Sequence, residues 1–134
     1  MMRIVIDTNV LVSGILFGGR PAYLIRLVLM RAVSAVATQA IIDEYQSTMD
    51  YLVRKYNGRG LSFPLKSICS AMEIIPAQSQ VHVCRDPDDD KFVSCAIDGQ
   101  CYYIVSGDKD LLTLKEYSDV KIVTVSVFFE LLKM

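Results

Sequence analysis

The stretch RIVIDTNVLVSG (Arg3–Gly14) decides the fold, because a charged residue directly follows a run of apolar β-formers. Ile4, Val5 and Ile6 are typical of a strand that is covered on both faces, as in a parallel sheet. Asp7 then lies at the carboxyl end of that strand, where the loops of open α/β sheets form a ligand-binding crevice. The alternative is that Asp7 caps the following turn with its own side chain.

Length and composition are typical of one folded domain over residues 1–134. The chain of 134 residues is 52% hydrophobic and 22% charged, which excludes a disordered protein. No apolar stretch reaches the ~18 to 20 residues that a membrane span needs. The first residues also lack the pattern of a signal peptide, because Asp7 interrupts the apolar run. We therefore expect a soluble, cytoplasmic protein.

Charge and cysteine content restrict the partners. Lys and Arg total 14 against 15 for Asp and Glu, so the net charge is −1. A nucleic acid would have to be bound by local basic groups and with help from cations. The four cysteines have no CxxC spacing and His82 is the single histidine, which argues against a zinc site. We expect the thiols to be reduced and structural.

Helical and strand patterns alternate along the rest of the chain. The predicted helices are 22–32, a long helix after the N-cap Thr38 that ends at a loop over 57–60, a helix near 64–72, one that begins at 86–87, and 109–117 and 126–133. A short apolar run covers 34–37, and further strands are predicted at 102–106 and 121–125. Strands that alternate with helices predict an α/β fold with a parallel sheet and helices on both faces.

Carboxylates fall where these elements begin and end. Asp108 lies just past the predicted strand at 102–106, as Asp7 lies past Ile6. Two acids at the same edge of one sheet are hard to explain as two independent caps. Glu44, near the start of the long helix, would adjoin the same edge, although an ordinary Glu at this position complements the helix dipole.

The segment CRDPDDDKFVSCA (84–96) adds a further acid. Counting back three residues from Phe92, on the buried face of the helix, places Asp89 on the inward face and Asp90 partly aside. An acidic first turn also complements the helix dipole, which explains the N-cap Asp86 well and Asp89 less well.

Acids that are brought together repel each other unless a cation joins them or one of them takes a proton. Ligands that are all oxygen suit Mg²⁺ or Mn²⁺ and argue against zinc. Because Mg²⁺ commonly bridges carboxylates and phosphates, the reaction predicted from these residues is metal-assisted attack of water on a phosphodiester.

Four segments, in this order, resemble the PIN-domain nucleases and, more narrowly, their prokaryotic subgroup of toxins from toxin–antitoxin pairs: IDTNVLVSGILFGGRP (6–21), IIDEYQSTMDYLVRKY (41–56), RDPDDDKFVSCA (85–96) and IVSGDKDLL (104–112). The resemblance implies a three-layer, Rossmann-like α/β fold with the acids at the carboxyl edge of a central parallel sheet. It also implies Mg²⁺- or Mn²⁺-dependent cleavage of single-stranded RNA, a homodimer, and an antitoxin protein that neutralises the enzyme.

Residue by residue, the resemblance assigns both catalytic and supporting positions. The metal-binding, catalytic acids are Asp7, Glu44, Asp89 or Asp90, and Asp108; the supporting residues are Asn9, Ser106 and Asp110, the last a second candidate beside Asp108. Ser106 is placed to hydrogen-bond Asp7 or a metal-bound water. The basic residues beside these segments, candidates for contacts with RNA phosphates, are Arg20, Arg85, Lys91 and Lys109. All four acidic positions are filled, which argues against a degenerate, inactive copy.

Two other functions are alternatives to the nuclease. A phosphotransferase that uses Asp7 as nucleophile wants a second acid two residues later, where this chain has Asn9. A non-catalytic Mg²⁺-binding interaction domain, receiver-like or of a degenerate PIN type, explains an acidic pocket and the near-neutral charge. It explains Glu44 and the third acid less well.

Overall fold

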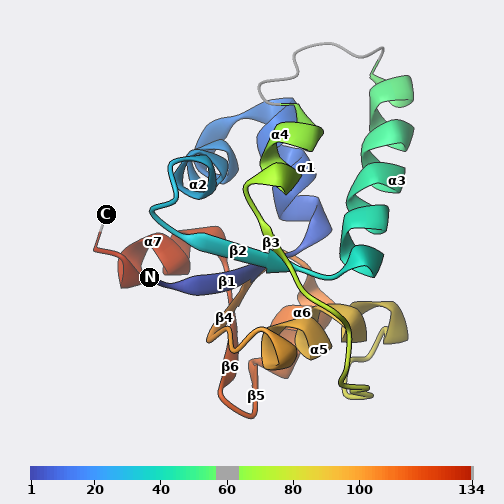
Figure 1. The fold of residues 1–134 in the computed structure, drawn as a ribbon, viewed down its shortest axis with the longest axis vertical. Helices are drawn as coiled ribbons and strands as arrows, with labels where there is room; N and C mark the ends of the chain where they lie inside the picture. Colours follow the sequence, from blue (N-terminus) through green and yellow to red (C-terminus); the bar gives the residue numbers. More distant parts are fainter. Residues whose placement is uncertain (57–63, 134) are drawn as a thin grey trace.

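A computed structural model describes residues 1–56 and 64–133, in which strands and helices alternate (Figure 1). The elements are β1 (Arg3–Ile6), α1 (Thr8–Phe17), α2 (Gly19–Leu29), β2 (Ser34–Ala37), α3 (Gln39–Lys55), α4 (Leu65–Ser70), β3 (Glu73–Ile74), α5 (Asp90–Asp98), β4 (Tyr103–Val105), α6 (Lys109–Leu114), β5 (Glu116–Tyr117), β6 (Val120–Val123) and α7 (Val125–Leu131). A 3₁₀ turn over Pro87–Asp89 precedes α5. The loop predicted at 57–60 lies outside the described residues.

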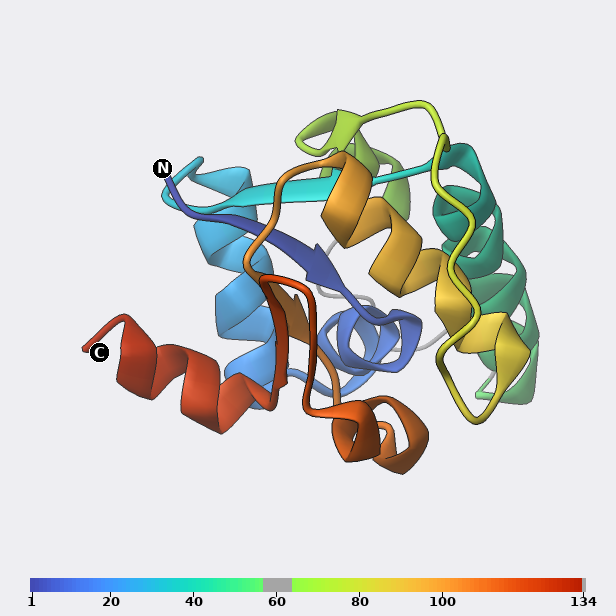
Figure 2. The ribbon, with the colours of Figure 1, turned by 90° about the horizontal axis from the view of Figure 1, so that it is seen from below.

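The strands form one sheet in the order β3-β2-β1-β4-β6-β5. All neighbouring pairs are parallel except β5 and β6, which are antiparallel. Helices α1 to α4 lie on one side of the sheet and α5 on the other (Figures 1 and 2). Ile4, Val5 and Ile6 of β1 are at most 1% exposed, as expected for a central strand with both faces covered. The predicted α/β fold with a central parallel sheet is therefore confirmed.

Helix α1 was not expected from the sequence. Its side chains contact the core on several sides, so buried residues such as Leu11, Val12 and Ile15 do not form the single apolar stripe that predicts an amphipathic helix. Gly14 lets α1 and α2 approach closely, because a Cβ at this position would lie 2.6 Å from Ile25 Cδ1 and 2.8 Å from the backbone of Pro21. Helix α2 begins at Gly19, three residues before the predicted start.

The end of α6 also differs from the prediction. A helix was expected over 109–117, but α6 ends at Leu114, and Glu116–Tyr117 pairs with β6 in a short hairpin. Lys115 and Ser118, on either side of β5, have φ of 64° and 55°, a conformation that no α-helix accommodates. The four cysteines are free thiols, as predicted.

Among the described helices, none is by itself long and apolar enough to cross a bilayer, and α1 and α2 meet the length only as a pair bent by 102°.

Candidate active site

The predicted acids meet at the carboxyl edge of the sheet. Asp7 follows β1 and Asp108 lies three residues after β4, and these two strands are parallel neighbours. A cavity of about 190 Å³ at this edge is lined by Asp7, Thr8, Asn9, Glu44, Thr48, Asp86, Asp88, Asp89 and Asp108. Residues from four separate segments of the sequence therefore share one small acidic cavity.

Asp7 occupies the N-cap position of α1 but does not use its side chain as a cap on that helix, all of which is described. Instead, the buried Ser106 hydroxyl donates a 2.7 Å hydrogen bond to Asp7 Oδ2. Ser106 Oγ in turn accepts a 3.0 Å bond from the Asp108 backbone N–H. Burial raises the pKa of Asp7, the bond from Ser106 opposes this rise, and the charge of Asp108 adds to it. The predicted bond between Ser106 and Asp7 is present, and the Asp7 side chain makes no capping bond to α1.

Asp89 is the most perturbed acid of the cavity. Burial, a hydrogen bond shared with the Asp108 carboxyl and the nearby charges of Asp108 and Asp7 raise the pKa of Asp89 to about 7. Its Oδ2 atom is buried and finds no hydrogen-bond partner within the described part of the chain. A buried carboxylate oxygen that faces other acids is the arrangement that a cation would satisfy.

Glu44 is held by groups on two sides. The Thr8 hydroxyl donates to Glu44 Oε2, and Lys91 Nζ lies 2.5 Å from Glu44 Oε1. One residue further along α3, the buried Tyr45 hydroxyl donates a 2.5 Å bond to the carbonyl of Ile6, which ties this helix to the end of β1. Lys91 is therefore a cation built into the site, and it partly offsets the charge of Glu44.

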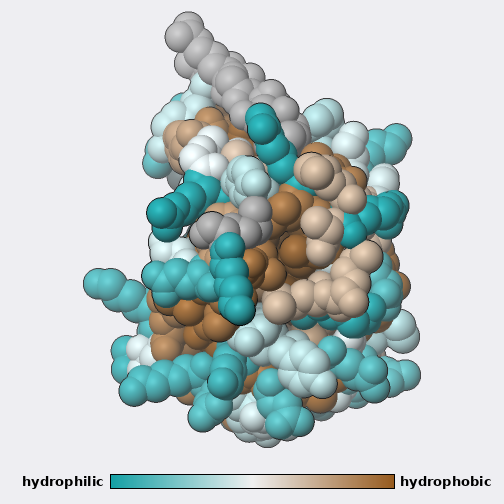
Figure 3. Space-filling view, turned by 90° about the vertical axis from the view of Figure 1, so that its left-hand side faces the viewer, coloured by the Kyte–Doolittle hydropathy of each residue, from teal (hydrophilic) through white to brown (hydrophobic). Residues whose placement is uncertain are grey.

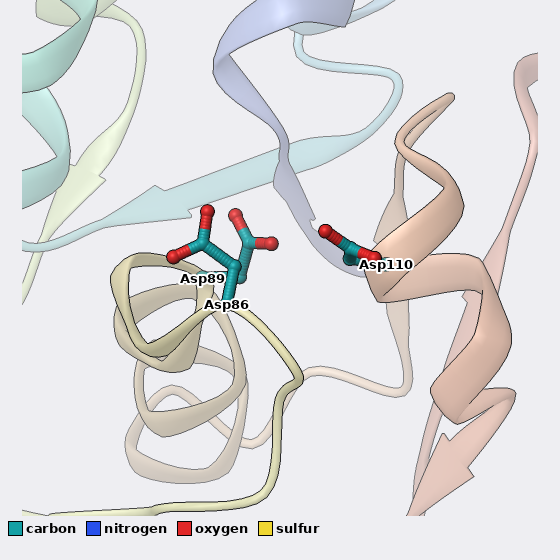
Figure 4. Close-up of side chains that lie close together, drawn as sticks. All are labelled: Asp86, Asp89 and Asp110. Atoms are coloured by element: carbon teal, nitrogen blue, oxygen red, sulfur yellow. The ribbon is translucent and has the colours of Figure 1, made fainter.

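A second grouping of acids overlaps the first. Over residues 1–56 and 64–133, one set of three acids has ligand oxygens that all lie within 4.8 Å of one another, namely Asp86, Asp89 and Asp110 (Figure 4). Asp86 also caps the 3₁₀ turn by accepting a 3.0 Å bond from the Asp88 backbone N–H. Asp110 lies 3.5 Å from Arg85 Nη1. Asp86 and Asp89 thus belong to both groupings.

The structure separates the two candidates for the third acid. Over the described residues, the cavity lining includes Asp89 and not Asp90. Asp90 is buried, and its Oδ1 accepts bonds of 3.1 and 2.9 Å from the backbone N–H groups of Val83 and Cys84. Burial opposes the charge of Asp90, but these bonds outweigh it and lower the pKa. Asp90 therefore anchors the backbone of Val83 and Cys84, whereas Asp89 lines the cavity.

Several residues of the lining were not predicted from the sequence. Thr8 and Thr48 were not expected there, Asp86 was interpreted as a helix cap, and Asp86 and Asp88 were interpreted as acids that complement the helix dipole. Two signals were available for Asp86 and Thr8. Asp86 begins the acidic run that contains Asp89, and Thr8 directly follows Asp7. Thr48 is one helical turn after Glu44, which places it on the same face of α3.

The four predicted basic residues differ in what they contact. Lys91 pairs with Glu44, and Arg85 pairs with Asp110. Lys109 is exposed between Asp108 and Asp110 and lines the adjoining depression. Arg20 is on α2, where its Nη1 donates a 2.9 Å bond to Ser126 Oγ of α7.

The donor groups of the cavity fit a hard divalent cation. Its lining side chains carry carboxylate, hydroxyl and amide groups, and oxygen ligands of this kind suit Mg²⁺ and Mn²⁺. Asp89 Oδ2, which has no partner within residues 1–56 and 64–133, supplies a second reason, because a cation there would offset both the cost of its burial and the repulsion among the acids.

Comparisons with known proteins agree with this arrangement. Residues 3–110 match the family model described as PIN domain. The uncharacterized protein MJ1680 of Methanocaldococcus jannaschii is 30% identical over 119 residues, which cover 86% of this chain and 76% of that protein. The fold is also similar to a chain in the crystal structure of VapBC2 from Rickettsia felis bound to a DNA fragment from their promoter, with a TM-score of 0.54, 15% identity, and coverage of 90% of this chain and 97% of that one.

Proposed function

This chain belongs to the PIN domain family, and from this premise we propose that it is a Mg²⁺- or Mn²⁺-dependent endoribonuclease. In the proposed reaction it hydrolyses phosphodiester bonds of single-stranded RNA, and the whole of residues 1–134 acts as one nuclease domain. The observation that carries the proposal is the cavity lined by Asp7, Glu44, Asp89 and Asp108, in which Asp89 Oδ2 has no hydrogen-bond partner among the described residues.

The chain's own residues have distinct parts in this mechanism. Asp7, Glu44, Asp89 and Asp108 would hold the divalent ion, with Asp86 and Asp110 close by. When bound, such an ion activates water and neutralises charge on the scissile phosphate. Ser106 fixes the rotamer of Asp7 through Oδ2 and at the same time positions the backbone of Asp108. Asn9 lines the same cavity and is placed to orient water or phosphate.

Binding of RNA by this near-neutral protein would depend on cations around the acids. Arg85 and Lys109 are exposed beside the cavity, Lys91 is bound to Glu44, and Arg20 lies further along the surface. We propose these four residues as contacts for RNA phosphates, which position the strand without reading its bases.

A toxin of a toxin–antitoxin pair is the biological role that we propose, with an antitoxin protein as partner in the cytoplasm. The similarity of the fold to a VapBC2 chain supports this role. We also propose a homodimer. The side of the molecule drawn in Figure 3 has a broad hydrophobic area. On α7, Phe128 and Phe129 belong to the core, whereas Val127 and Leu131 are 40% and 44% exposed and available to a second copy.

The test is cleavage of a mixed single-stranded RNA pool by the purified protein with Mn²⁺, Mg²⁺ or EDTA. We expect cutting that needs the metal, that disappears in Asp7→Asn, and that persists in Asp43→Asn. Asp43 is an exposed acid next to Glu44 and bonds to Gln39, so it is a matched control outside the cavity. A folded protein that binds Mn²⁺ but leaves every RNA intact would instead support a non-catalytic interaction domain.

A further inference from the structure

We propose that the hollow between α2 and α7 binds one guanine base of the RNA strand whose scissile phosphate lies at the acidic cavity. The inference rests on the proposed ribonuclease function and adds a base-specific subsite to it. The hollow has a volume of about 730 Å³ and is lined by Gly19, Arg20, Tyr23, Ser126, Phe129 and Glu130.

The hollow and the acidic cavity each share lining residues with one further depression. This depression has a volume of about 590 Å³. Asn9 and Asp108 line both the acidic cavity and this depression. Ser126 lines both the depression and the α2–α7 hollow. A single strand that crosses the acids can therefore follow one surface path from the cleaved bond into the hollow.

The depression has the chemistry of a path for the sugar–phosphate backbone. Its lining includes Ser13, Thr124 and Ser126, whose hydroxyls donate and accept hydrogen bonds, and the exposed ammonium group of Lys109. Contacts of this kind position a nucleic acid but do not distinguish its bases. Base selection would therefore have to occur further along the path.

The α2–α7 hollow presents an aromatic surface at that point. The rings of Tyr23 and Phe129 meet edge to face, with centroids 5.6 Å apart and planes at 74°. Phe129 is 7% exposed and packs against Tyr23, which is 46% exposed. Unpaired RNA bases stack on exposed aromatic rings of this kind.

Charged groups on the rim select guanine among the bases. Arg20 is held at the junction with the depression by its 2.9 Å bond to Ser126. Glu130, one turn further along α7, is exposed and offers two carboxylate oxygens. Guanine presents two adjacent N–H donors on its Watson–Crick edge and acceptors at O6 and N7, so it can satisfy Glu130 and Arg20 together. Uracil, adenine and cytosine each lack part of this set.

The test measures binding without cleavage. Fluorescence anisotropy in EDTA would compare a labelled oligouridine with versions that carry a single guanine, adenine or cytosine. We expect the wild type to bind the guanine version about 5-fold or more tightly than oligouridine. Glu130→Gln should lose this difference while binding oligouridine as the wild type does, and Tyr23→Ala should lose the difference and also bind oligouridine more weakly, because stacking on the ring does not distinguish bases. Tyr51→Ala, which removes a 61% exposed tyrosine of α3 outside the hollow, should keep it.

Three results would overturn the subsite. One is equal affinity of the wild type for all four oligonucleotides. Another is an equal loss of affinity for every oligonucleotide in Glu130→Gln, a change that removes no packing. A third is a Tyr23→Ala variant that becomes monomeric, by light scattering, with an unchanged RNA preference, because the hollow would then belong to a protein interface.

Failure of the subsite and failure of the nuclease are separate outcomes. Metal-dependent RNA cleavage without base preference removes the subsite and keeps the enzyme. Guanine-dependent binding without cleavage in any metal keeps the subsite and removes the nuclease.

Discussion

Two sets of carboxylates that are mixed in the sequence have opposite surroundings in the fold. The first set lines the acidic cavity and includes Asp89, whose pKa is raised to about 7 and whose Oδ2 lacks a partner among the described residues. The second consists of Asp90 and Asp98 of α5, which, with Ser94 between them, we call the α5 ladder. Asp89 and Asp90 are neighbours in the sequence. The surroundings of Asp89 disfavour its charged form, whereas those of Asp90 favour it.

The α5 ladder holds an extended segment along the helix. Asp98 accepts bonds of 2.8 and 3.0 Å from the backbone N–H groups of Gln78 and Ser79. Ser94 Oγ accepts from Val81 N–H at 3.3 Å, and Asp90 accepts from the next residues along the segment. Burial opposes the charge of both acids, but the hydrogen bonds lower the pKa of each below its usual value.

Structural and functional acids differ in the groups that surround their negative charge. A ladder acid is stabilised by backbone N–H groups and contributes to folding. A cavity acid faces other acids, which costs stability unless a ligand supplies positive charge. Carboxylates that repel one another around one cavity are expected at a binding or catalytic site, because function there is maintained at a cost to local stability.

The largest difference is expected between variants of the neighbouring acids Asp89 and Asp90. Asp89→Asn removes a proposed ligand and should lower metal-dependent RNA cleavage by about 100-fold or more, while melting in EDTA stays at or above the wild-type temperature. Asp90→Asn, an equal change one residue away, should keep cleavage in the folded protein. The division would be wrong if the two variants lost activity to the same extent.

Removal of an acid of the α5 ladder should lower the stability of the protein, whereas removal of a cavity acid should not. Asp90→Ala leaves the N–H groups of Val83 and Cys84 without their acceptor, and we expect the free energy of unfolding to fall by ~2 kcal/mol. Urea denaturation in EDTA measures this change. Asp88→Ala, which removes an exposed acid two residues away, is the matched control and should stay close to the wild type. A loss in Asp88→Ala as large as in Asp90→Ala would argue against the ladder.

Much of the fold and of the cavity could be predicted because the signals are local. The apolar run Ile4–Ile6 predicts a buried strand, and Asp7 and Asp108 follow strands whose parallel pairing brings their ends together. Helix periodicity also favoured Asp89 over Asp90 as the inward acid. These inferences need only the spacing of apolar and acidic residues in the sequence and the geometry of a parallel sheet.

The parts that were missed depend on contacts between distant segments. Helix α1 has no single polar face because neighbours cover several of its sides, and β5 exists because Glu116–Tyr117 pairs with β6. The role of Asp90 depends on the backbone of Val83 and Cys84, a segment without a regular pattern. Lys91 was expected to meet phosphate, and its pairing with Glu44 follows only when α3 and α5 pack together.

The pairing of Lys91 with Glu44 predicts competition with the metal. An ion that uses Glu44 has to replace Lys91, so Lys91→Met should tighten Mn²⁺ binding by about 5-fold. Titration calorimetry measures this affinity directly, without an activity assay. Lys121→Met, on the exposed surface of β6, serves as the control with the same change of net charge. Weaker binding in Lys91→Met would show instead that the lysine positions Glu44 for the ion.

The smallest predicted effect is the pH dependence of stability without metal. The pKa of Asp89 is raised from an ordinary 3.8 to about 7, so the folded state binds its proton more tightly than the unfolded state does. The stabilisation that this proton provides is complete below the ordinary value and is lost as the pH rises through about 7. The pKa of Asp7 is also raised, which adds a loss of the same sign.

Between about pH 5 and pH 8, the ladder acids should contribute a constant amount, because their lowered pKa values leave them ionised in both the folded and unfolded states. The melting temperature in EDTA should therefore fall by a few degrees, roughly 2 to 5 °C, across this interval. Asp89→Asn should flatten most of the slope, and Asp90→Asn should retain it. A wild-type melting temperature that stays constant or rises would mean that Asp89 is already ionised at low pH, and the contrast between the neighbouring acids would then rest on hydrogen bonds alone.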